Sequence, residues 1–532
     1  MKNTKTPFMR ILRRLAIISN TSKQTGISTD ELIQREQALF SRRDFLETTA
    51  KAGAVIGIAS TFPMLSSCKT TNENDNNTTD NVIKQTQTIA IIGGGMAGLN
   101  ACHTLKKNGF TSTIYEASTR TGGRMLSAHN VMGNNLVTEF GGEYIDTNHK
   151  EMFALMKEFN LETLDTFPSI KDKALDDIFI DGKHYTTKDA ITEFNKMNKT
   201  IEADLEKIGD NYEIGSYADK LDQLSIDEYL SKFTCKNWFK KFIQVAYESE
   251  FGYSTAELSS LNLITFIGTD TSKGEFKYFG DSDERYKVKG GNQQVVDKLA
   301  FAHKENILKE HVLTQIDQID KQYQLTFANG KKVTADFVIL AIPFTTLRKV
   351  KLNVTMSEEK KNAIEQLKYG TNAKFMFGVD KRVWRAQGYG GYLFNNLVQN
   401  GWDNSLAQNN DEGYGGYTVF LGGKAGNDLN KADKEKYIDG VDKAYPGTKA
   451  AHNGKTAFML WPSQPYTLGS YACFTKGQIV RILPHIATPI DNIFFAGEHC
   501  SEEFQGFMEG AAETGKAAAE QVLEKIKITA DN

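Results

Sequence analysis

The sequence predicts an α/β fold in which a domain built on a parallel sheet is interleaved with a second domain of mixed β-sheet and helices. The chain has 532 residues, which is too many for one compact core. A continuous apolar run at 88–92, typical of a buried parallel strand, passes directly into a glycine-rich turn and a helical pattern. A similar run, typical of a buried strand, follows much later at 335–343.

Composition narrows the class of protein. Charged residues make up 24% of the chain and the formal net charge is -3, so the strongly basic surface that binds nucleic acid is not expected. Apart from Cys68, the cysteines are widely scattered, with no spacing typical of a metal site or a disulfide framework. We therefore expect no bound metal, no disulfide framework and no nucleic-acid partner.

The first 68 residues differ from the rest and resemble a bacterial export signal. Residues 1–43 hold nine Lys and Arg but only three acids, and the apolar stretch behind them, 52–65, is too short to span a bilayer comfortably. Residues 41–46 read S-R-R-D-F-L, which resembles the twin-arginine export motif, with Glu47 where a lysine is common. The alternative is an arginine pair on a solvated helix face.

A lipid attachment signal follows directly. Residues 65–68 read L-S-S-C, which resembles the box of bacterial lipoproteins whose cysteine is acylated and becomes the mature N-terminus. The alternative is a buried cysteine near a plain cleavage site. Residues 69–87 are dominated by Asn and Thr and fit a flexible linker. We expect a bacterial protein that leaves by the twin-arginine route, resides in the periplasm, and contacts a membrane only through a lipid on Cys68.

A dinucleotide-binding motif follows the first predicted strand. Gly93, Gly95 and Gly98 form the pattern G-x-G-x-x-G between a strand and a helix, which is the context of a Rossmann-like domain. These glycines would allow a tight turn, close approach of a pyrophosphate, and packing of helix on strand. The helix N-terminus, at Met96 and Ala97, would present unpaired N–H groups and a partial positive charge to the phosphates.

The next segment distinguishes between dinucleotides. A second predicted strand, 111–115, ends at Glu116, where a carboxylate can accept hydrogen bonds from an adenosine ribose. Residues 116–124 read E-A-S-T-R-T-G-G-R, and here the chain resembles the flavin amine oxidase superfamily, in which this extension wraps the FAD pyrophosphate (a GR2-type domain). The glycines would allow close backbone approach, and Arg120 and Arg124 would supply forked donors for phosphate oxygens or flanking carboxylates.

The resemblance continues in pieces over about 86–527 and implies how the chain is divided. Residues 139–145 (E-F-G-G-E-Y-I) match a paired-glycine segment near the flavin ring, and 286–291 (Y-K-V-K-G-G) match a returning glycine pair. A hairpin is expected at 323–333, centred on Asn-Gly. The predicted FAD-binding domain comprises 88–150, 284–349 and 485–527, and the predicted substrate domain comprises 151–283 and 350–484.

The most specific match lies near the C-terminus. Residues 494–499 read F-F-A-G-E-H, and residues 506–515 read G-F-M-E-G-A-A-E-T-G before a helix that runs towards Ile526. The resemblance implies that Glu498 binds the ribityl or pyrophosphate region of FAD and that the helix starts beneath the flavin edge. Backbone N–H groups near Met508, with the helix dipole, would stabilise negative charge on the reduced ring. The alternative for each glycine is an ordinary turn or helix cap.

One lysine is expected beside the reacting ring. Residues 369–375 (Y-G-T-N-A-K-F), followed by 383–385 (V-W-R), resemble the amine oxidase segment whose lysine holds a water against flavin N5. The resemblance implies that Lys374 is this lysine and that its charge positions the water for oxygen activation or reoxidation. The alternative is a surface lysine on an alternating strand.

Another segment is expected to form one wall in front of the flavin. Trp461, Ser470 and Tyr471 fall on it, and Ser470 stands where monoamine oxidases have a cysteine bonded to FAD. We therefore predict non-covalent FAD, with a link through Cys473 as the alternative. Tyr471 and Phe507 are expected to sandwich the amine and keep it desolvated and neutral, because hydride loss requires the nitrogen lone pair.

An arginine that binds the substrate carboxylate in some related enzymes is a guide to the substrate class. Snake-type L-amino-acid oxidases carry an arginine soon after the first paired glycines, where this chain has Tyr144-Ile145-Asp146. The expected carboxylate clamp is therefore absent from that place, although an arginine from an inserted segment could replace it. Glu143 and Asp146 would attract a cationic amine or polyamine if they face the cavity.

The resemblance as a whole implies an FAD-dependent amine oxidase that converts an amine to an imine and then an aldehyde while O2 becomes hydrogen peroxide. An L-amino-acid oxidase, a desaturase or dehydrogenase with another electron acceptor, and a non-catalytic flavin-stabilised binding module remain open, as does a homodimer. The predicted catalytic residues are Lys374, Tyr471 and Phe507. The predicted cofactor-binding residues are Gly93, Gly95, Met96, Ala97, Gly98, Glu116, Ala117, Arg120, Gly123, Arg124, Gly141, Gly142, Glu143, Tyr144, Val312, Trp461, Gly497, Glu498, Gly506, Phe507 and Met508.

Overall fold

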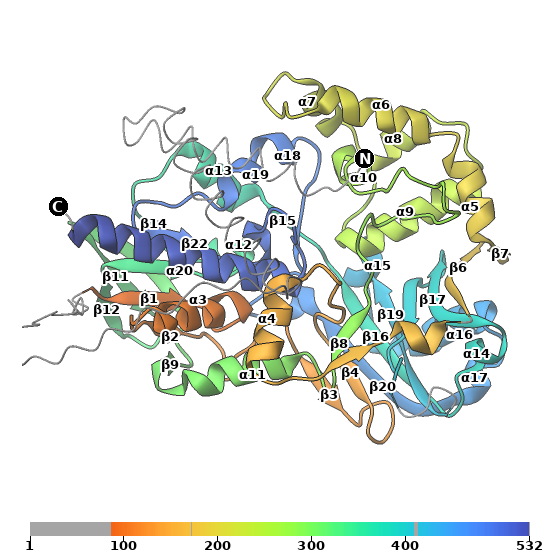
Figure 1. Cartoon of the computed structure of the whole chain (residues 1–532), viewed down its shortest axis with the longest axis horizontal. Coiled ribbons are helices and arrows are strands. Elements are labelled where there is room, and N and C mark those ends of the chain that lie inside the picture. Colours follow the sequence, from red (N-terminus) through yellow and green to blue (C-terminus); the bar gives the residue numbers. More distant parts are fainter. Residues whose placement is uncertain (1–86, 172, 409–412, 531–532) are drawn as a thin grey trace, which may run out of the picture. The chain divides into compact units, whose positions relative to one another are not determined.

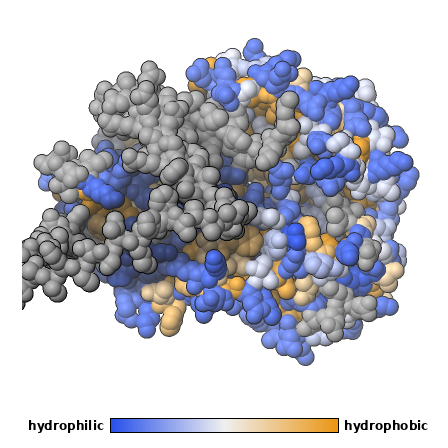
Figure 2. Space-filling model, in the orientation of Figure 1, coloured by the Kyte–Doolittle hydropathy of each residue, from blue (hydrophilic) through white to orange (hydrophobic). Residues whose placement is uncertain are grey.

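The structure is a computed structural model that describes residues 87–171, 173–408 and 413–530. The predicted export signal (1–68) and all but the last residue of the predicted linker (69–87) lie outside the described residues. Within the described ranges, no helix is both long enough and apolar enough to cross a membrane. On the face seen in Figure 2, hydrophilic side chains are spread over the described surface, with small hydrophobic areas between them.

A five-stranded parallel sheet contains the predicted Rossmann-like unit. Its strands, in spatial order, are β22 (Ile493–Phe495), β13 (Phe337–Leu340), β1 (Ile89–Ile92), β2 (Thr113–Tyr115) and β9 (Ile307–Leu308). The chain runs outward from β1 through β2 to β9 and returns on the other side with β13 and β22. The strand order therefore reverses between β1 and β13, and ligands of such sheets bind beyond the carboxyl ends of the strands at this reversal.

Two helices pack side by side along this sheet, α3 (Met96–Lys107) and α20 (Met508–Ala530) (Figure 1). Their close approach depends on Gly515, because a Cβ atom there would lie 2.1 Å from the carbonyl oxygen of Ala97. The apolar face of α3, which includes Leu99 and Leu105, is fully buried in the core that these helices share with the sheet. The predicted strand, turn, helix and second strand are therefore all present, with β2 beginning at Thr113 rather than at residue 111.

A four-stranded sheet follows β9 in the chain. Its order is β12 (Lys332–Ala335), β11 (Gln322–Phe327), β10 (Leu313–Ile319) and β14 (Lys351–Asn353). Strands β11 and β12 pair antiparallel, which confirms the hairpin predicted at 323–333. The backbone N–H of His311 donates to the carbonyl of Glu116, so the chain entering β10 passes the carboxyl end of β2.

A seven-stranded mixed sheet forms the second major layer. Its order is β20 (His452–Leu460), β16 (Ala373–Val379), β19 (Gly415–Leu421), β18 (Gln399–Asp403), β17 (Tyr389–Asn395), β6 (Ala174–Ile180) and β7 (Lys183–Tyr185). Only the β17–β6 pair among these strands is parallel. The strands come from both pieces of the predicted substrate domain, whose boundaries stay a prediction.

Helices from the inserted segment accompany this sheet. They are α5 (Thr187–Phe194), α6 (Asn198–Ile208), α7 (Tyr217–Asp222), α8 (Ile226–Ser231), α9 (Asn237–Phe251) and α10 (Ser260–Ile264). Helix α9 packs against β6, β17 and β18 (Figure 1). This packing brings the C-terminal end of α9 to strands that lie far from it in the sequence, in the region where the substrate is predicted to bind.

Strand β16 decides the position of Lys374. Every residue of β16 is buried, and Phe375 and Phe377 belong to the hydrophobic cluster on one face of the sheet. Because side chains alternate along a strand, Lys374 and Met376 lie on the opposite face. Lys374 is only 4% exposed, so the alternative prediction of a surface lysine is wrong.

Candidate active site

A cavity of about 760 Å³ lies at the carboxyl ends of β1, β2 and β13. Gly93 lines it directly after β1, Glu116 directly after β2, and Ala341 directly after β13. At its other end, Lys374 from β16 and Trp402 from β18 line the same cavity. The cavity therefore connects the reversal point of the parallel sheet, where a nucleotide is expected, with one face of the mixed sheet.

Four glycines shape the end of the cavity next to the parallel sheet. Gly93 has φ +103°, and a Cβ atom there would lie 2.5 Å from the carbonyl oxygen of Ala341. A Cβ atom on Gly98 would lie 1.9 Å from the carbonyl oxygen of Gly93, so Gly98 allows the helix to pack on the strand. Gly95 is different, because its Cβ would meet nothing closer than the Cα of Gly123, at 3.9 Å. A side chain on Gly95 would therefore occupy cavity space, and this bare surface fits a dinucleotide.

Two helix N-termini lie at the cavity. Helix α3 begins after Gly95 without a side-chain cap, and its first residues Met96 and Ala97 line the cavity. Helix α20 begins at Met508, which also lines the cavity. Free N–H groups and the partial positive charge of a helix start favour anions such as a pyrophosphate or a reduced, negatively charged ring.

The carboxylate of Glu116 is held in a defined orientation at the end of β2. Its Oε2 accepts a hydrogen bond from the backbone N–H of Gly94 at 2.6 Å, and its Oε1 accepts one from Ser118 at 2.7 Å. Carboxylate oxygens can each accept a further bond, so capacity remains for ribose hydroxyls. Ala117 and Val312 line the cavity as well, as predicted from the resemblance.

The two predicted phosphate-binding arginines are used differently. Arg120 donates to the carbonyl oxygen of Gly123 at 2.6 Å and so braces the glycine turn. Arg124 donates to Oε1 of Glu498 at 2.8 Å and to the carbonyl oxygen of Ser470 at 2.6 Å. The sequence predicted that these arginines bind either phosphate oxygens or a flanking carboxylate. For Arg124, the partner in the structure is a carboxylate, that of Glu498.

Glu498 joins three segments that are far apart in the sequence. Only 3% of the residue is exposed. Besides its contact with Arg124, the carboxylate accepts hydrogen bonds from the backbone N–H groups of Gly506, at 3.0 Å, and Ala472, at 3.3 Å. The predicted pyrophosphate side and the start of α20 are therefore tied together through one buried side chain.

The ammonium group of Lys374 has three protein acceptors. Its Nζ lies 3.0 Å from the carbonyl oxygen of Glu139, 2.9 Å from that of Gly141, and 2.9 Å from Oε2 of Glu143. An ammonium has three N–H donors, so in this arrangement none is left for the water that the resemblance implies. Lys374 lines the cavity and presents its positive charge there rather than a free donor.

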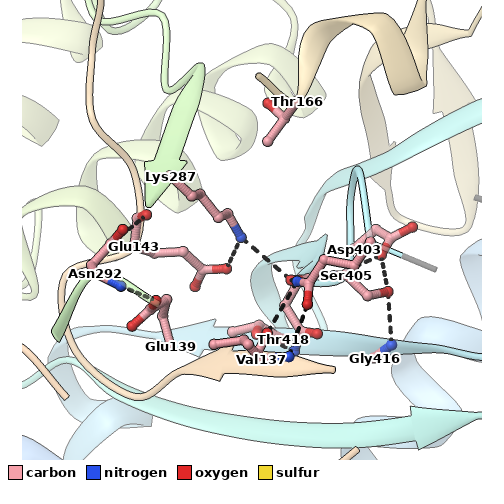
Figure 3. A network of polar contacts seen from close by, with 12 residues as sticks. Val137, Glu139, Glu143, Thr166, Lys287, Asn292, Asp403, Ser405, Gly416 and Thr418 are labelled. Atoms are coloured by element: carbon pink, nitrogen blue, oxygen red, sulfur yellow. Dashed lines mark hydrogen bonds and ion pairs between the residues drawn. The ribbon is translucent and has the colours of Figure 1, made fainter. Parts of the chain in front are cut away.

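Glu143 lies between two lysines. Its Oε1 is 2.6 Å from Nζ of Lys287, which extends from β8 (Tyr286–Val288) (Figure 3). Its Oε2 lies 2.9 Å from Nζ of Lys374. Burial by itself would raise the pKa of Glu143, but the two ammonium groups outweigh burial, and the pKa is lowered. Glu143 is therefore an anion whose charge is already compensated within the protein.

The structure corrects the expectation that Glu143 and Asp146 attract the substrate. Asp146 does not line the cavity, and its Oδ1 accepts a hydrogen bond from the backbone N–H of Glu284 at 2.8 Å. Burial raises the pKa of Asp146 to about 6. Glu143 lines the cavity but its carboxylate is bound to lysines. Neither carboxylate is placed to bind a cationic amine.

Two other carboxylates line the cavity instead, and sequence reasoning missed both. Glu250 is the penultimate residue of α9, and Glu284 stands just before β8. Burial, with the negative charges of Glu250 and Asp146, raises the pKa of Glu284 well above its usual range. No motif surrounds Glu250, whereas Glu284 stands two residues before the returning glycine segment and could have been suspected from that position.

Aromatic side chains form much of the remaining surface. Tyr471 and Phe507, the two residues expected to sandwich an amine, both line the cavity, as do Tyr144, Trp402 and Phe420. The hydroxyl of Tyr471 donates a hydrogen bond to the backbone carbonyl of Glu250, which fixes the ring. Such walls exclude water from a small apolar or amphipathic ligand.

The position of Ser470 bears on how the cofactor is attached. Ser470 lines the cavity, and its hydroxyl donates to Oδ1 of Asn372 at 2.6 Å. Cys473, in β21 (Ala472–Cys473), is fully buried and is not among the lining residues. The four described cysteines are free thiols. A covalent link through Cys473 therefore has no structural support, and non-covalent binding is consistent with the site.

With the exception of Gly98, the predicted site residues all line this one cavity. Gly98 does not line the cavity, but it allows α3 to pack closely on β1. The glycine turn, the fixed Glu116 carboxylate and the two helix starts together fit an FAD molecule, which supplies a two-electron acceptor when bound.

Comparison with known proteins agrees with this geometry. The family model for flavin containing amine oxidoreductases matches residues 96–523. Amine oxidase A of Sus scrofa is 23% identical over 460 residues, 82% of this chain and 85% of that protein. The L-amino acid dehydrogenase of Synechocystis is 24% identical over 459 residues, 81% of this chain and 94% of that protein.

A solved structure shows the same fold. Wild-type putrescine oxidase bound to putrescine aligns with a TM-score of 0.71 at 20% identity, covering 82% of this chain and 99% of that chain. The family match spans most of the sequence and includes most of the residues that line the cavity. This chain therefore belongs to the family of flavin-containing amine oxidoreductases, and it is an FAD-dependent enzyme.

Proposed function

We propose that the protein oxidises an amine that carries a second positive charge, such as a diamine or a polyamine. The amine would become an imine, which water hydrolyses to an aldehyde, and O2 would take the two electrons as hydrogen peroxide. The observation that carries this proposal is the pair of carboxylates, Glu250 and Glu284, on the cavity surface near Tyr471. FAD, when bound, accepts the hydride from the carbon beside the reacting nitrogen.

The charges around this pair favour a cationic ligand. A carboxyl group whose pKa is raised by burial and by neighbouring carboxylates, as for Glu284, gains stability in its charged form when a cation binds nearby. An ammonium group placed between Glu250 and Glu284 would offset their mutual repulsion. The second nitrogen of a diamine provides such a group while the first nitrogen reacts.

The positively charged side chains that line the cavity favour an amine as substrate over an amino acid. Among the described lining residues, Arg120 and Arg124 are the arginines, and both have partners at the cofactor end. Lys374 is paired with Glu143, and Lys349 is an exposed residue near α12 (Phe344–Leu347). A substrate carboxylate would thus meet the Glu250–Glu284 pair without a guanidinium to bind it.

The aromatic residues serve the chemical step. Tyr471 and Phe507 would enclose the reacting carbon and nitrogen and exclude water, which favours the neutral amine whose lone pair the reaction requires. The distal ammonium keeps its charge because it faces carboxylates. The two nitrogens of one substrate would therefore have different protonation states within the same cavity.

The test is anaerobic bleaching of the flavin band by a straight-chain diamine, a monoamine of the same length, and L-amino acids. We expect the diamine to reduce the enzyme fastest. Glu284→Gln and Glu250→Gln should lower kcat/KM for the diamine by roughly 10- to 100-fold, the worth of about 1.5–3 kcal/mol for a charged hydrogen bond. The monoamine should lose much less, and the exposed control Glu275→Gln should change neither.

The same measurement separates the other candidates. The relative from Synechocystis that is named as an L-amino acid dehydrogenase keeps amino-acid oxidation as the second candidate, and bleaching by L-amino acids alone would favour it. Rapid bleaching followed by slow recovery in air would indicate a dehydrogenase with another acceptor. An enzyme that no amine or amino acid bleaches would contradict the proposal altogether.

A further inference from the structure

A buried cluster of three charged side chains lies beside the cavity, formed by Lys287, Glu143 and Lys374 and called here the lysine–glutamate cluster. The exposed fractions of these residues are 3%, 6% and 4%. The carboxylate of Glu143 contacts Lys287 through one oxygen, at 2.6 Å, and Lys374 through the other, at 2.9 Å. Two ammonium groups and one carboxylate leave the cluster with one net positive charge.

Lys287 has few other partners. Its Nζ also contacts the carbonyl oxygen of Asn404, at 3.3 Å, and lies 4.6 Å from the centre of the Tyr144 ring. Figure 3 shows the side chain of Lys287 extending from β8 to Glu143, beside the hydrogen-bond network that contains Asp403 and Thr418. Its main electrostatic partner in this network is Glu143.

A second acid near the cluster, Glu139, does not take the place of Glu143 in balancing the charge of Lys374. The carboxylate of Glu139 accepts hydrogen bonds from the backbone N–H of Asn292, at 2.8 Å, and from the hydroxyl of Ser127, at 2.7 Å. Burial raises the pKa of Glu139 to about 7. Glu143 is therefore the acid that directly opposes the charge of Lys374.

The members of the cluster differ in their relation to the cavity. Lys374 and Glu143 line it, whereas Lys287 does not. Without Lys287, the carboxylate of Glu143 would cancel the charge of Lys374, and the net charge on this part of the cavity would fall from one to zero. Lys287 therefore acts on a ligand in the cavity without touching it, chiefly by offsetting the charge of Glu143.

We propose that Lys287 is a positioning residue that offsets the charge of Glu143, so that the cluster presents a net positive charge to bound flavin and favours its anionic reduced form. The proposal rests on the expectation, from the resemblance to flavin amine oxidases, that Lys374 lies beside the reacting ring, and it does not depend on which amine is oxidised. A hydride brings two electrons and one proton to oxidised flavin, so the reduced form carries one more negative charge. A nearby positive charge stabilises that form and raises the reduction potential.

The test measures the two-electron potential of the bound flavin in the FAD-loaded enzyme, together with the dissociation constant of sulfite, which adds to flavin N5 to give an anionic adduct. We expect Lys287→Met to lower the potential by about 30 mV or more, which is a tenfold shift of the equilibrium for two electrons. Sulfite should bind about tenfold more weakly. Lys287→Arg should retain both values, because the guanidinium keeps the charge.

Lys289→Met is the matched control, since Lys289 lies two residues further along and is exposed in a surface pair with Glu162. It should leave potential and sulfite affinity unchanged. An unchanged potential in Lys287→Met with normal flavin content would overturn the proposal, and so would a Lys287→Arg variant as impaired as Lys287→Met. A merely structural role would lower stability without this dependence on charge.

A double variant covers the case in which Lys287→Met does not fold, because that change leaves Glu143 with one buried partner fewer. Lys287→Met combined with Glu143→Gln leaves Lys374 as the single charge, so the net charge again equals one and no buried carboxylate is uncompensated. Its potential should return to the wild-type value, and a lowered potential would contradict the proposal. Neither readout requires an amine or O2, so failure of the proposed function is recognised separately, by the bleaching experiment.

Discussion

The ammonium nitrogen of Lys374 lies 2.9 Å from Oε2 of Glu143, and both side chains are buried. The two carbonyl oxygens that complete the contacts of Lys374 belong to Glu139 and Gly141, in the same short segment. The segment that holds the paired glycines therefore also fixes the lysine. Replacing this lysine by a neutral residue removes one positive charge from the cavity surface together with these contacts.

Replacing Lys374 by Met should slow the reaction of the reduced enzyme with O2 by about 100-fold, in line with the loss of one preorganised charge at a developing anion. The reduction of the flavin by substrate should change less, because the aromatic walls remain. Stopped-flow mixing of reduced enzyme with O2, compared with anaerobic reduction, separates the two steps. Lys321→Met, in an exposed turn, is the control, and an unchanged oxygen rate would remove Lys374 from this role.

The cofactor should leave the protein on denaturation. Ser470 stands where a covalent link would be expected, and the Cys473 thiol is buried away from the cavity. Acid precipitation should therefore release all FAD into the supernatant, as absorbance at 450 nm will report. If yellow colour stays with the pellet, Cys473→Ser identifies whether that cysteine forms the link.

Arg124→Met should weaken FAD binding and the fold together. Glu498 is almost fully buried, and removal of its guanidinium partner leaves a carboxylate without its counter-charge, at a cost of about 3 kcal/mol. Urea unfolding and flavin fluorescence measure the two effects. Lys476→Met removes an exposed pair with Glu228 and should leave the free energy of unfolding almost unchanged, because water and salt screen such pairs. Equal losses in both variants would show that the Arg124–Glu498 contact has no special role.

Glu509 should make stability fall as pH rises from about 4.5 to 7. Its buried carboxyl accepts hydrogen bonds from the backbone N–H groups of Glu151 and Met152, but burial dominates and raises its pKa to about 7. A group with a raised folded-state pKa contributes stability below its unfolded pKa and loses it as pH rises through the folded pKa. The slope approaches one proton, about 1.4 kcal/mol per pH unit.

The measurement is the difference in free energy of unfolding between wild type and Glu509→Gln as a function of pH. Because Gln does not titrate, the variant should become relatively more stable from pH 4.5 to 7. Glu275→Gln, which changes an exposed carboxylate, should give a flat difference. A flat difference for Glu509→Gln as well would contradict the raised pKa.

Export stays a prediction from the sequence alone. We expect replacement of Arg42 and Arg43 by Lys to keep the protein in the bacterial cytoplasm, because the twin-arginine receptor reads that pair. Cys68→Ser should abolish labelling with a radioactive fatty acid and release the exported protein from the membrane fraction. Labelling that persists in Cys68→Ser would show that the lipid, if any, is attached elsewhere.

Local patterns made much of this protein predictable. The turn at Gly93, the start of α3 and the carboxylate at Glu116 depend on contacts between residues close in the chain or on backbone conformations that only glycine allows. Alternation along β16 even determined that Lys374 and Phe375 face opposite sides. The alternation by itself does not show which of the two sides faces the cavity.

Sequence by itself determined the fold class, the cofactor and a set of residues that line the cofactor end of the cavity, because these follow from short motifs. Only the tertiary structure decided the charges at the substrate end. Glu143 is neutralised by Lys287, which is 144 positions away, and Glu250 reaches the cavity because α9 packs on the mixed sheet. Coulomb interactions depend on distance in space and on burial, and neither can be read from separation along the chain.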